Sequence, residues 1–153
     1  MQAVFTCFFS PTWLIYFSDF VSTPCLRLAV LLLLQGSWDT LSMVAVVCSS
    51  WSVVNRHSSQ RNELVPEGQT RSASVMNGNK MVSRVSLLLL LIGCLGSSYI
   101  LENPERSIIL EYPRLRWTFR ALKCLGVSAL CFNLSVFPIY VLFCCSAVCG
   151  LGF

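Results

Sequence analysis

Apolar residues along this chain form blocks of different length and composition, and these blocks predict alternating helices and strands. Residues 26–36, "LRLAVLLLLQG", form an apolar block of helix length that ends at a glycine, as many helices do. Residues 40–47, "TLSMVAVV", form a shorter block with β-branched side chains, which is typical of a buried strand. The pattern therefore begins with a helix and continues with a strand.

The same pair of elements is predicted a second time further along the chain. Residues 81–93, "MVSRVSLLLLLIG", predict an apolar helix, and "SYIL" at 98–101 predicts a short strand. The uncharged run 85–101 has 17 residues, and glycines divide it, whereas a membrane span needs about 20 apolar residues. We therefore favour a buried helix followed by a buried strand over a membrane span.

Apolar strands between apolar helices are typical of a parallel sheet that helices cover on both faces. We predict an α/β fold with the order helix, strand, loop, helix, strand. The loop at 55–80 has no apolar period and is longer than an ordinary connector, which marks it as functional or disordered. The stretch 55–84 has a net charge of +3, a weak indication of contact with nucleic acid.

Residues 124–153 contain no charged side chain and are long enough to cross a membrane. Arg114, Arg116, Arg120 and Lys123 come just before them. The positive-inside rule then puts residues 26–123 on the cytoplasmic side. We interpret 124–153 as a hydrophobic helical tail that holds the protein in a membrane as a transmembrane helix. Two alternatives stay open, namely non-native sequence from a shifted reading frame and a pair of buried core helices.

Composition fits both a membrane protein and a fully covered sheet, because 55% of residues are hydrophobic, 12% are charged and the mean hydropathy is +0.68. The length of 153 residues leaves room for one modest domain and a tail. We divide the chain into an apolar N-terminal segment of unclear role (1–25), a central domain (26–123) and the tail (124–153). Nine cysteines, an odd number, and one histidine predict neither a disulfide framework nor a metal site.

Two chemically suited residues follow the two predicted strands. Ligand sites of open parallel sheets lie beyond the carboxyl ends of the strands. The first strand leads into "VCSSW", which contains Cys48, and the second leads into "LENP", which contains Glu102. A thiolate and a carboxyl group at neighbouring strand ends can act as nucleophile and acid on an aromatic ring. Without further context, Cys48 would be a core cysteine and the Glu-Asn-Pro sequence an ordinary turn.

Four pieces of the chain, "VCSSWSVVNR", "NKMVSR", "LENPERS" and "YPRLRW", carry a family resemblance over residues 26–120. This region resembles the catalytic half of cytosine-5 DNA methyltransferases, and more closely a set of uncharacterised methyltransferase-like proteins of unicellular eukaryotes. The resemblance implies a partial Rossmann-like methyltransferase sheet. It also implies that Cys48 is the nucleophile that adds to cytosine, that Glu102 contacts the ring nitrogen and that Asn103 positions Glu102. The methyl donor would be S-adenosylmethionine, and the substrate a base flipped out of DNA.

The chain also departs from that family. Val47 and Pro104 stand where the family usually has proline and valine, and residues 1–25 contain no glycine for a cofactor loop. Nothing after Lys123 matches a target-recognition region. The resemblance therefore implies a degenerate or truncated methyltransferase-like protein that is inactive alone. Its cofactor-binding residues are unknown, and so is any protein partner that would complete it.

A second reading belongs to a different class of protein. The chain would be a small multi-pass membrane protein that spans the bilayer with residues 3–21, 28–54, 85–101 and the tail. Asp39 would then lie near the middle of a span, which is costly and would require a partner for its carboxylate. The two readings differ in the relation of Cys48 to Glu102. They are neighbours in a sheet under the first reading and far apart under the second.

Overall fold

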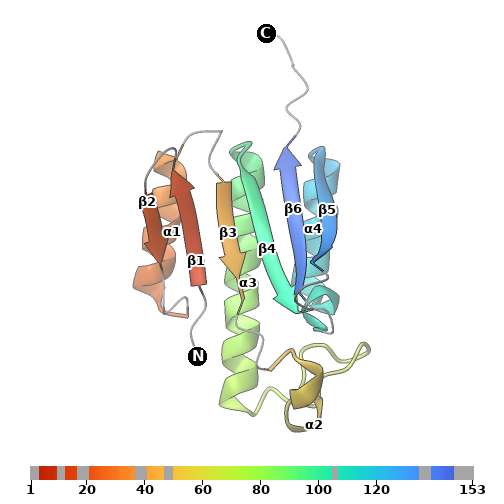
Figure 1. Ribbon diagram of the computed structural model, residues 1–153. Coiled ribbons are helices and arrows are strands. Elements are labelled where there is room, and N and C mark those ends of the chain that lie inside the picture. The colour runs from red at the N-terminus through yellow and green to blue at the C-terminus, as the bar shows by residue number, and fades with distance from the viewer. Residues whose placement is uncertain are drawn as a thin grey trace.

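A computed structural model describes residues 4–9, 13–16, 21–36, 41–46, 50–104, 107–134 and 139–146. These residues form an α/β structure in which one six-stranded sheet packs against a layer of helices (Figure 1). The strands are β1 (Val4–Phe9), β2 (Trp13–Tyr16), β3 (Leu41–Ala45), β4 (Ser98–Pro104), β5 (Val127–Leu134) and β6 (Ile139–Ser146). The helices are α1 (Thr23–Gln35), α2 (Arg56–Ser59), α3 (Ala73–Cys94) and α4 (Pro113–Cys124), with 3₁₀ turns η1 (Val53–Asn55) and η2 (Ile109–Glu111).

The sheet has the strand order β2-β1-β3-β4-β6-β5. Strands β3 and β4 are parallel, and every other neighbouring pair is antiparallel. The connection from β3 to β4 contains α3, as a crossover between parallel strands requires. The predicted order of helix, strand, loop, helix and strand is confirmed in α1, β3, α3 and β4. The parallel part of the sheet is a single pair of strands.

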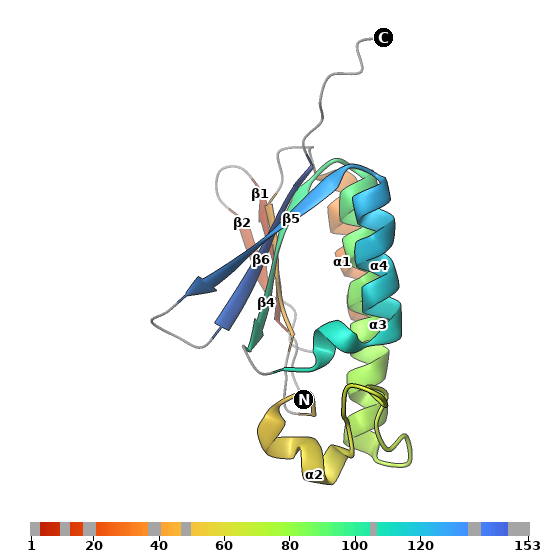
Figure 2. The same cartoon turned by 90° about the vertical axis from the view of Figure 1, so that its right-hand side faces the viewer.

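The helical layer differs from the expected arrangement with helices on both faces. Figure 2 shows α1, α3 and α4 together on one side of the sheet. Along β3, Ser42 and Val44 are buried, whereas Leu41, Met43 and Ala45 are half-buried. Because side chains alternate between the two faces of a strand, one face meets the helices and the other does not. The apolar run misled the prediction, since apolar residues occupy both faces of β3.

Local sequence explains the start and end of α1. The backbone N–H of Cys25 donates to Ser22 Oγ at 3.4 Å, and a proline stands in the first turn, where its missing N–H costs nothing. At the other end, the N–H of Gly36 donates to the Leu32 carbonyl at 3.0 Å. Arg84 of α3 also donates to the carbonyls of Val21 and Ser22, both at 2.6 Å. The start of α1 is therefore tied to α3.

The loop predicted at 55–80 is shorter than expected. Residues 56–59 form α2, and α3 already begins at Ala73, eight residues before the predicted helix. Only Val75 and Gly78 are buried in this first part of α3, and its other side chains up to Lys80 are polar or exposed. Two buried positions were too few to reveal a helical period.

The expected helical tail is not confirmed by the described residues. In 124–153 the structure has two antiparallel strands, β5 and β6, and β6 pairs with β4. Valine and phenylalanine occur four times each in 124–153, and both residue types favour strands. Residues 135–138 and 147–153 lie outside the described part. One described helix, α3, is long and apolar enough to cross a membrane by length and composition, and half of its most apolar window is buried inside the protein.

Candidate functional site

The carboxyl ends of β3 and β4 lie together at one edge of the sheet. The strands are parallel, and Ala45 is the register partner of Glu102. Cys48 itself lies outside the described residues, three positions after Ala45 in the sequence. Both flanks of its segment are buried, at Val46 on one side and Ser50 on the other. The described residue Ala45, three positions before Cys48, thus lies beside Glu102, and the position of Cys48 itself stays a prediction.

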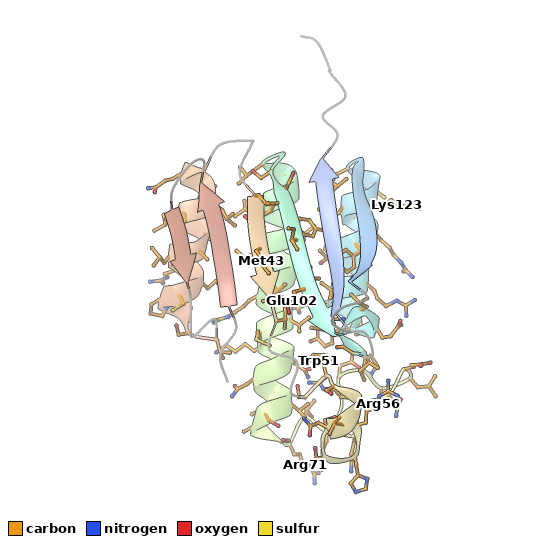
Figure 3. All side chains as sticks on the ribbon, viewed as in Figure 1. Met43, Trp51, Arg56, Arg71, Glu102 and Lys123 are labelled. Atoms are coloured by element: carbon orange, nitrogen blue, oxygen red, sulfur yellow. The ribbon has the colours of Figure 1, made fainter. Side chains whose placement is uncertain are left out.

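Glu102 and Asn103 face opposite sides of the sheet. Tyr99, Leu101 and Asn103 are buried, with Asn103 only 1% exposed, whereas Ile100 and Glu102 are half-buried. This alternation places Asn103 toward the helical layer and Glu102 on the uncovered face. Figure 3 shows Glu102 on β4 close to the carboxyl end of β3. Any influence of Asn103 on Glu102 would therefore have to pass through the backbone of β4.

Trp51 anchors the segment that follows Cys48. Its side chain is fully buried, and the ring of Tyr112 meets it edge-on with centroids 5.3 Å apart. The carbonyl of Trp51 accepts a hydrogen bond from the N–H of Ile108 at 3.3 Å. Figure 3 shows Trp51 just beyond the ends of β3 and β4. These contacts fix one end of the segment with Cys48 near the end of β4.

A buried arginine completes this anchor. The guanidinium carbon of Arg61 lies 3.5 Å from the centre of the Trp51 ring, a cation–π contact, and Arg61 is only 2% exposed. Its Nη1 donates to the Pro66 carbonyl at 2.5 Å, and its Nη2 donates to the Val75 carbonyl at 3.2 Å and to Ser50 Oγ at 3.4 Å. Burial lowers the pKa of Arg61 to about 10, although Tyr112 and Glu67 act in the opposite direction. The side chain is therefore still a cation at neutral pH.

Gly78 lets α3 approach this anchor closely. A Cβ atom at position 78 would lie 2.6 Å from Ser50 Oγ, 3.2 Å from Arg61 Nη2 and 3.3 Å from Trp51 Nε1. The three polar atoms thus converge on the bare backbone of one helical residue. Trp51 Nε1 and Arg61 Nε are buried and have no hydrogen-bond partner among the described residues. We call Ser50, Trp51, Arg61 and Gly78 the anchor cluster.

The anchor cluster was not predicted from the sequence. Arg61 belongs to the polar segment 55–80, which we expected to be a functional or disordered loop, and nothing in its neighbours indicates burial. Gly78, within "VMNGNK", was the available signal, because a glycine inside a helix often marks a close approach. Trp51 was another, since tryptophan side chains are highly buried on average and this one stands three residues after a candidate nucleophile.

The strand next to β3 does not run in the direction that a cofactor loop for S-adenosylmethionine would need. A cofactor loop beside Cys48 would have to follow a strand that runs parallel to β3 and ends at the same edge. The neighbour in the structure is β1, which is antiparallel to β3, so its carboxyl end lies at the opposite edge. Among the described residues, no three His, Cys, Asp or Glu side chains gather into a possible metal site.

Comparison of the chain with protein-family models, with curated proteins and with solved structures found no match.

Proposed function

We propose that this chain is a degenerate DNA methyltransferase-like protein that keeps the nucleophile half of the site and does not transfer methyl groups alone. The observation that carries the proposal is the register of the parallel pair, in which Ala45 lies opposite Glu102 at the edge where Cys48 follows. The crossover helix α3 between the two strands agrees with the resemblance stated above. The resemblance does not account for the remaining strands β1, β2, β5 and β6, which pair in antiparallel fashion.

In this proposal each residue has a defined task. The thiolate of Cys48 would add to the ring carbon of a flipped cytosine, and the carboxyl group of Glu102 would hold the ring nitrogen. The anchor cluster would fix the segment with Cys48 in front of Glu102. Asn103, which is buried on the helical side, would hold the end of β4 in place. S-adenosylmethionine would supply the methyl group only where a second protein provides its binding site.

Calorimetry and a methylation assay test the first part of the proposal. Full-length chain is titrated with S-adenosylmethionine, and it is also incubated with duplex DNA and donor labelled in the methyl group. We expect neither binding nor incorporation of label. Incorporation by the chain alone, lost in Cys48→Ser, would show a complete enzyme and contradict the proposal. An unrelated protein would also fail both assays, so the proposal further requires Cys48 to lie within cross-linking reach of residue 102.

The multi-pass membrane reading is the second candidate, and the length and hydropathy of α3 favour it. One substitution in α3 distinguishes the membrane reading from the methyltransferase-like reading. Leu87 is 56% exposed in the middle of α3, so Leu87→Lys should leave a packed helix unchanged. At the centre of a span, a lysine would cost about 2.5–3.5 kcal/mol of insertion free energy. If alkaline carbonate releases Leu87→Lys from membranes but not the unchanged protein, α3 is a span and the methyltransferase-like reading fails.

Membrane attachment through residues 124–153, with 26–123 on the cytoplasmic side, is a separate part of the proposal, and it requires β5 and β6 to leave the sheet that they form in the structure. We expect carbonate-washed membranes to retain the full-length protein together with Leu87→Lys. Release of both proteins would remove the membrane anchor from the proposal and leave the site untouched.

A further inference from the structure

The outward side of the helical layer is apolar on all three of its helices. Large apolar side chains are exposed in α1 at Leu31 (55%) and Leu34 (56%), in α3 at Leu87 (56%) and in α4 at Trp117 (60%). One exposed leucine is ordinary, whereas several large apolar side chains on one surface indicate contact with another molecule. Figure 1 shows α1, α3 and α4 side by side, and Figure 2 shows them in one layer on the same side of the sheet.

The helical period turns Leu31, Leu87 and Trp117 away from the sheet. Successive residues of an α-helix are about 100° apart around its axis, so a residue two positions from a buried one lies on nearly the opposite side. The buried residues two positions away are Ala29 and Leu33 in α1, Val85 and Leu89 in α3, and Leu115 in α4. The three side chains therefore point outward from a single layer.

Basic residues accompany these apolar side chains on the same helix faces. Arg27 lies one turn before Leu31 in α1, and Arg120 lies one turn after Trp117 in α4. Both arginines are exposed. We define the outer helical face by six residues, namely Arg27, Leu31, Leu34, Leu87, Trp117 and Arg120.

The helices of this layer contribute positive charge. The sequences of α1, α3 and α4 contain seven Lys and Arg residues and no Asp or Glu. Three carboxylates, those of Glu63, Glu67 and Glu111, belong to the segments before α3 and α4, and Glu111 pairs with Arg116 at 3.2 Å. Seven cations against these three carboxylates leave an excess of four positive charges. The helical layer is therefore complementary to an anionic surface even when the carboxylates are counted.

We propose that the outer helical face binds the surface of an anionic lipid bilayer. Its three leucines would enter the boundary between headgroups and acyl chains, and Trp117 would lie at headgroup depth. The basic residues would pair with anionic lipid headgroups. In this arrangement the protein keeps its fold, and the uncovered face of the sheet stays in water. The inference rests neither on the proposed methyltransferase-like function nor on residues 124–153 as an anchor.

Other occupants match fewer of these features. A second copy of the chain would bring together two surfaces with the same excess of positive charge, which repel each other. Nucleic acid would pair with the basic residues but would leave the three leucines against its phosphate backbone. An acidic protein would need apolar groups that match positions on three separate helices, whereas fluid lipid chains adapt to any such spacing.

Vesicle binding by the purified full-length chain tests this proposal. We expect the chain to co-sediment with vesicles of phosphatidylcholine and phosphatidylserine. It should bind vesicles of phosphatidylcholine alone at least about tenfold more weakly, because the attraction of its basic residues is lost. High salt should release the chain from the mixed vesicles, because it screens charges at a surface.

Two substitutions test the two components of the outer helical face. Leu31→Ser removes apolar burial and Arg120→Glu reverses a charge, and each should weaken binding to the mixed vesicles at least about tenfold. The matched controls Val54→Ser and Arg71→Glu, at exposed positions outside the face, should change binding less than about threefold. All four side chains are exposed, so thermal unfolding should show an unchanged melting temperature for each variant.

Several results would overturn the proposal. They are no binding to the mixed vesicles, equal binding with and without phosphatidylserine, and binding that Leu31→Ser and Arg120→Glu leave unchanged. The last result would place the lipid contact in another part of the chain. Self-association in analytical ultracentrifugation that Leu31→Ser abolishes, without vesicle binding, would instead identify the face as an interface between copies. None of these results depends on Cys48 or Glu102, so the proposed function is tested separately.

Discussion

The guanidinium group of Arg61 lies 3.5 Å from the centre of the Trp51 ring, and both side chains are buried. This pair joins the segment after β3 to the polar segment before α3. It replaces with protein contacts much of the hydration that a buried cation loses. The site therefore depends on a residue that carries none of its chemistry.

Removal of Arg61 should be strongly destabilising. Arg61→Leu leaves the buried Pro66 carbonyl without its donor and removes a second donor from the Val75 carbonyl, and an unsatisfied buried group costs about 1–3 kcal/mol. We expect urea unfolding to show a loss of at least about 2 kcal/mol in the free energy of unfolding. Arg71→Leu, at an exposed position, should change it by less than about 0.5 kcal/mol. Equal effects of the two substitutions would mean that Arg61 is not buried.

A methyl group at position 78 should also be destabilising. Alanine is the better helix former by about 1 kcal/mol, so Gly78→Ala would stabilise a helix with free space at this point. The contact of 2.6 Å with Ser50 Oγ predicts the opposite sign, a net loss of about 1–3 kcal/mol in urea unfolding. Asn77→Ala, the exposed preceding residue, is the control. A more stable Gly78→Ala protein would contradict the close approach.

The tie between α3 and the start of α1 predicts a local effect. Arg84→Met removes the donor to the Val21 and Ser22 carbonyls, and each hydrogen bond to a charged group contributes about 1.5–3 kcal/mol. Amide hydrogen exchange in residues 23–28 should become faster, with little change in α4. Lys80→Met, an exposed substitution one turn earlier in α3, should leave exchange in α1 as it was. Uniformly faster exchange in all helices would argue against a local tie.

The two neighbouring residues at the end of β4 should differ in their effect on stability. Asn103→Ala removes a polar side chain that is 1% exposed and should cost about 1–3 kcal/mol of unfolding free energy. Glu102→Ala removes a half-buried carboxylate from the uncovered face and should cost less than about 1 kcal/mol. Urea unfolding of both variants measures the difference. The reverse order would place Glu102, rather than Asn103, toward the helices.

Prediction from sequence succeeded where the pattern was local and long. The glycine after α1 and the leucine run of α3 indicate helices by length and composition, and β3 and β4 are short apolar segments beside them. The parallel pairing of β3 and β4 followed from the helix between them.

Prediction failed where the outcome depended on distant parts of the chain. The same apolar composition suits a membrane helix and a strand, so residues 124–153 could not be assigned by hydropathy. In the structure, β6 pairs with the edge of β4 that β3 leaves open, and this pairing provides hydrogen-bond partners for backbone N–H and C=O groups of both strands. Likewise, Arg61 is buried because three oxygen acceptors and Trp51 surround it, and these lie at several positions along the chain.

The most direct test of the proposed site measures whether Cys48 lies near residue 102. Full-length Glu102→Cys is treated with a short bifunctional thiol cross-linker, and linked peptides are identified by mass spectrometry. Leu87→Cys is the matched control, because Leu87 belongs to α3, which lies on the helical side of the sheet. We predict a prominent link between Cys48 and position 102, and none between Cys48 and position 87. Absence of the first link, or equal yields of both, would contradict a site built from Cys48 and Glu102.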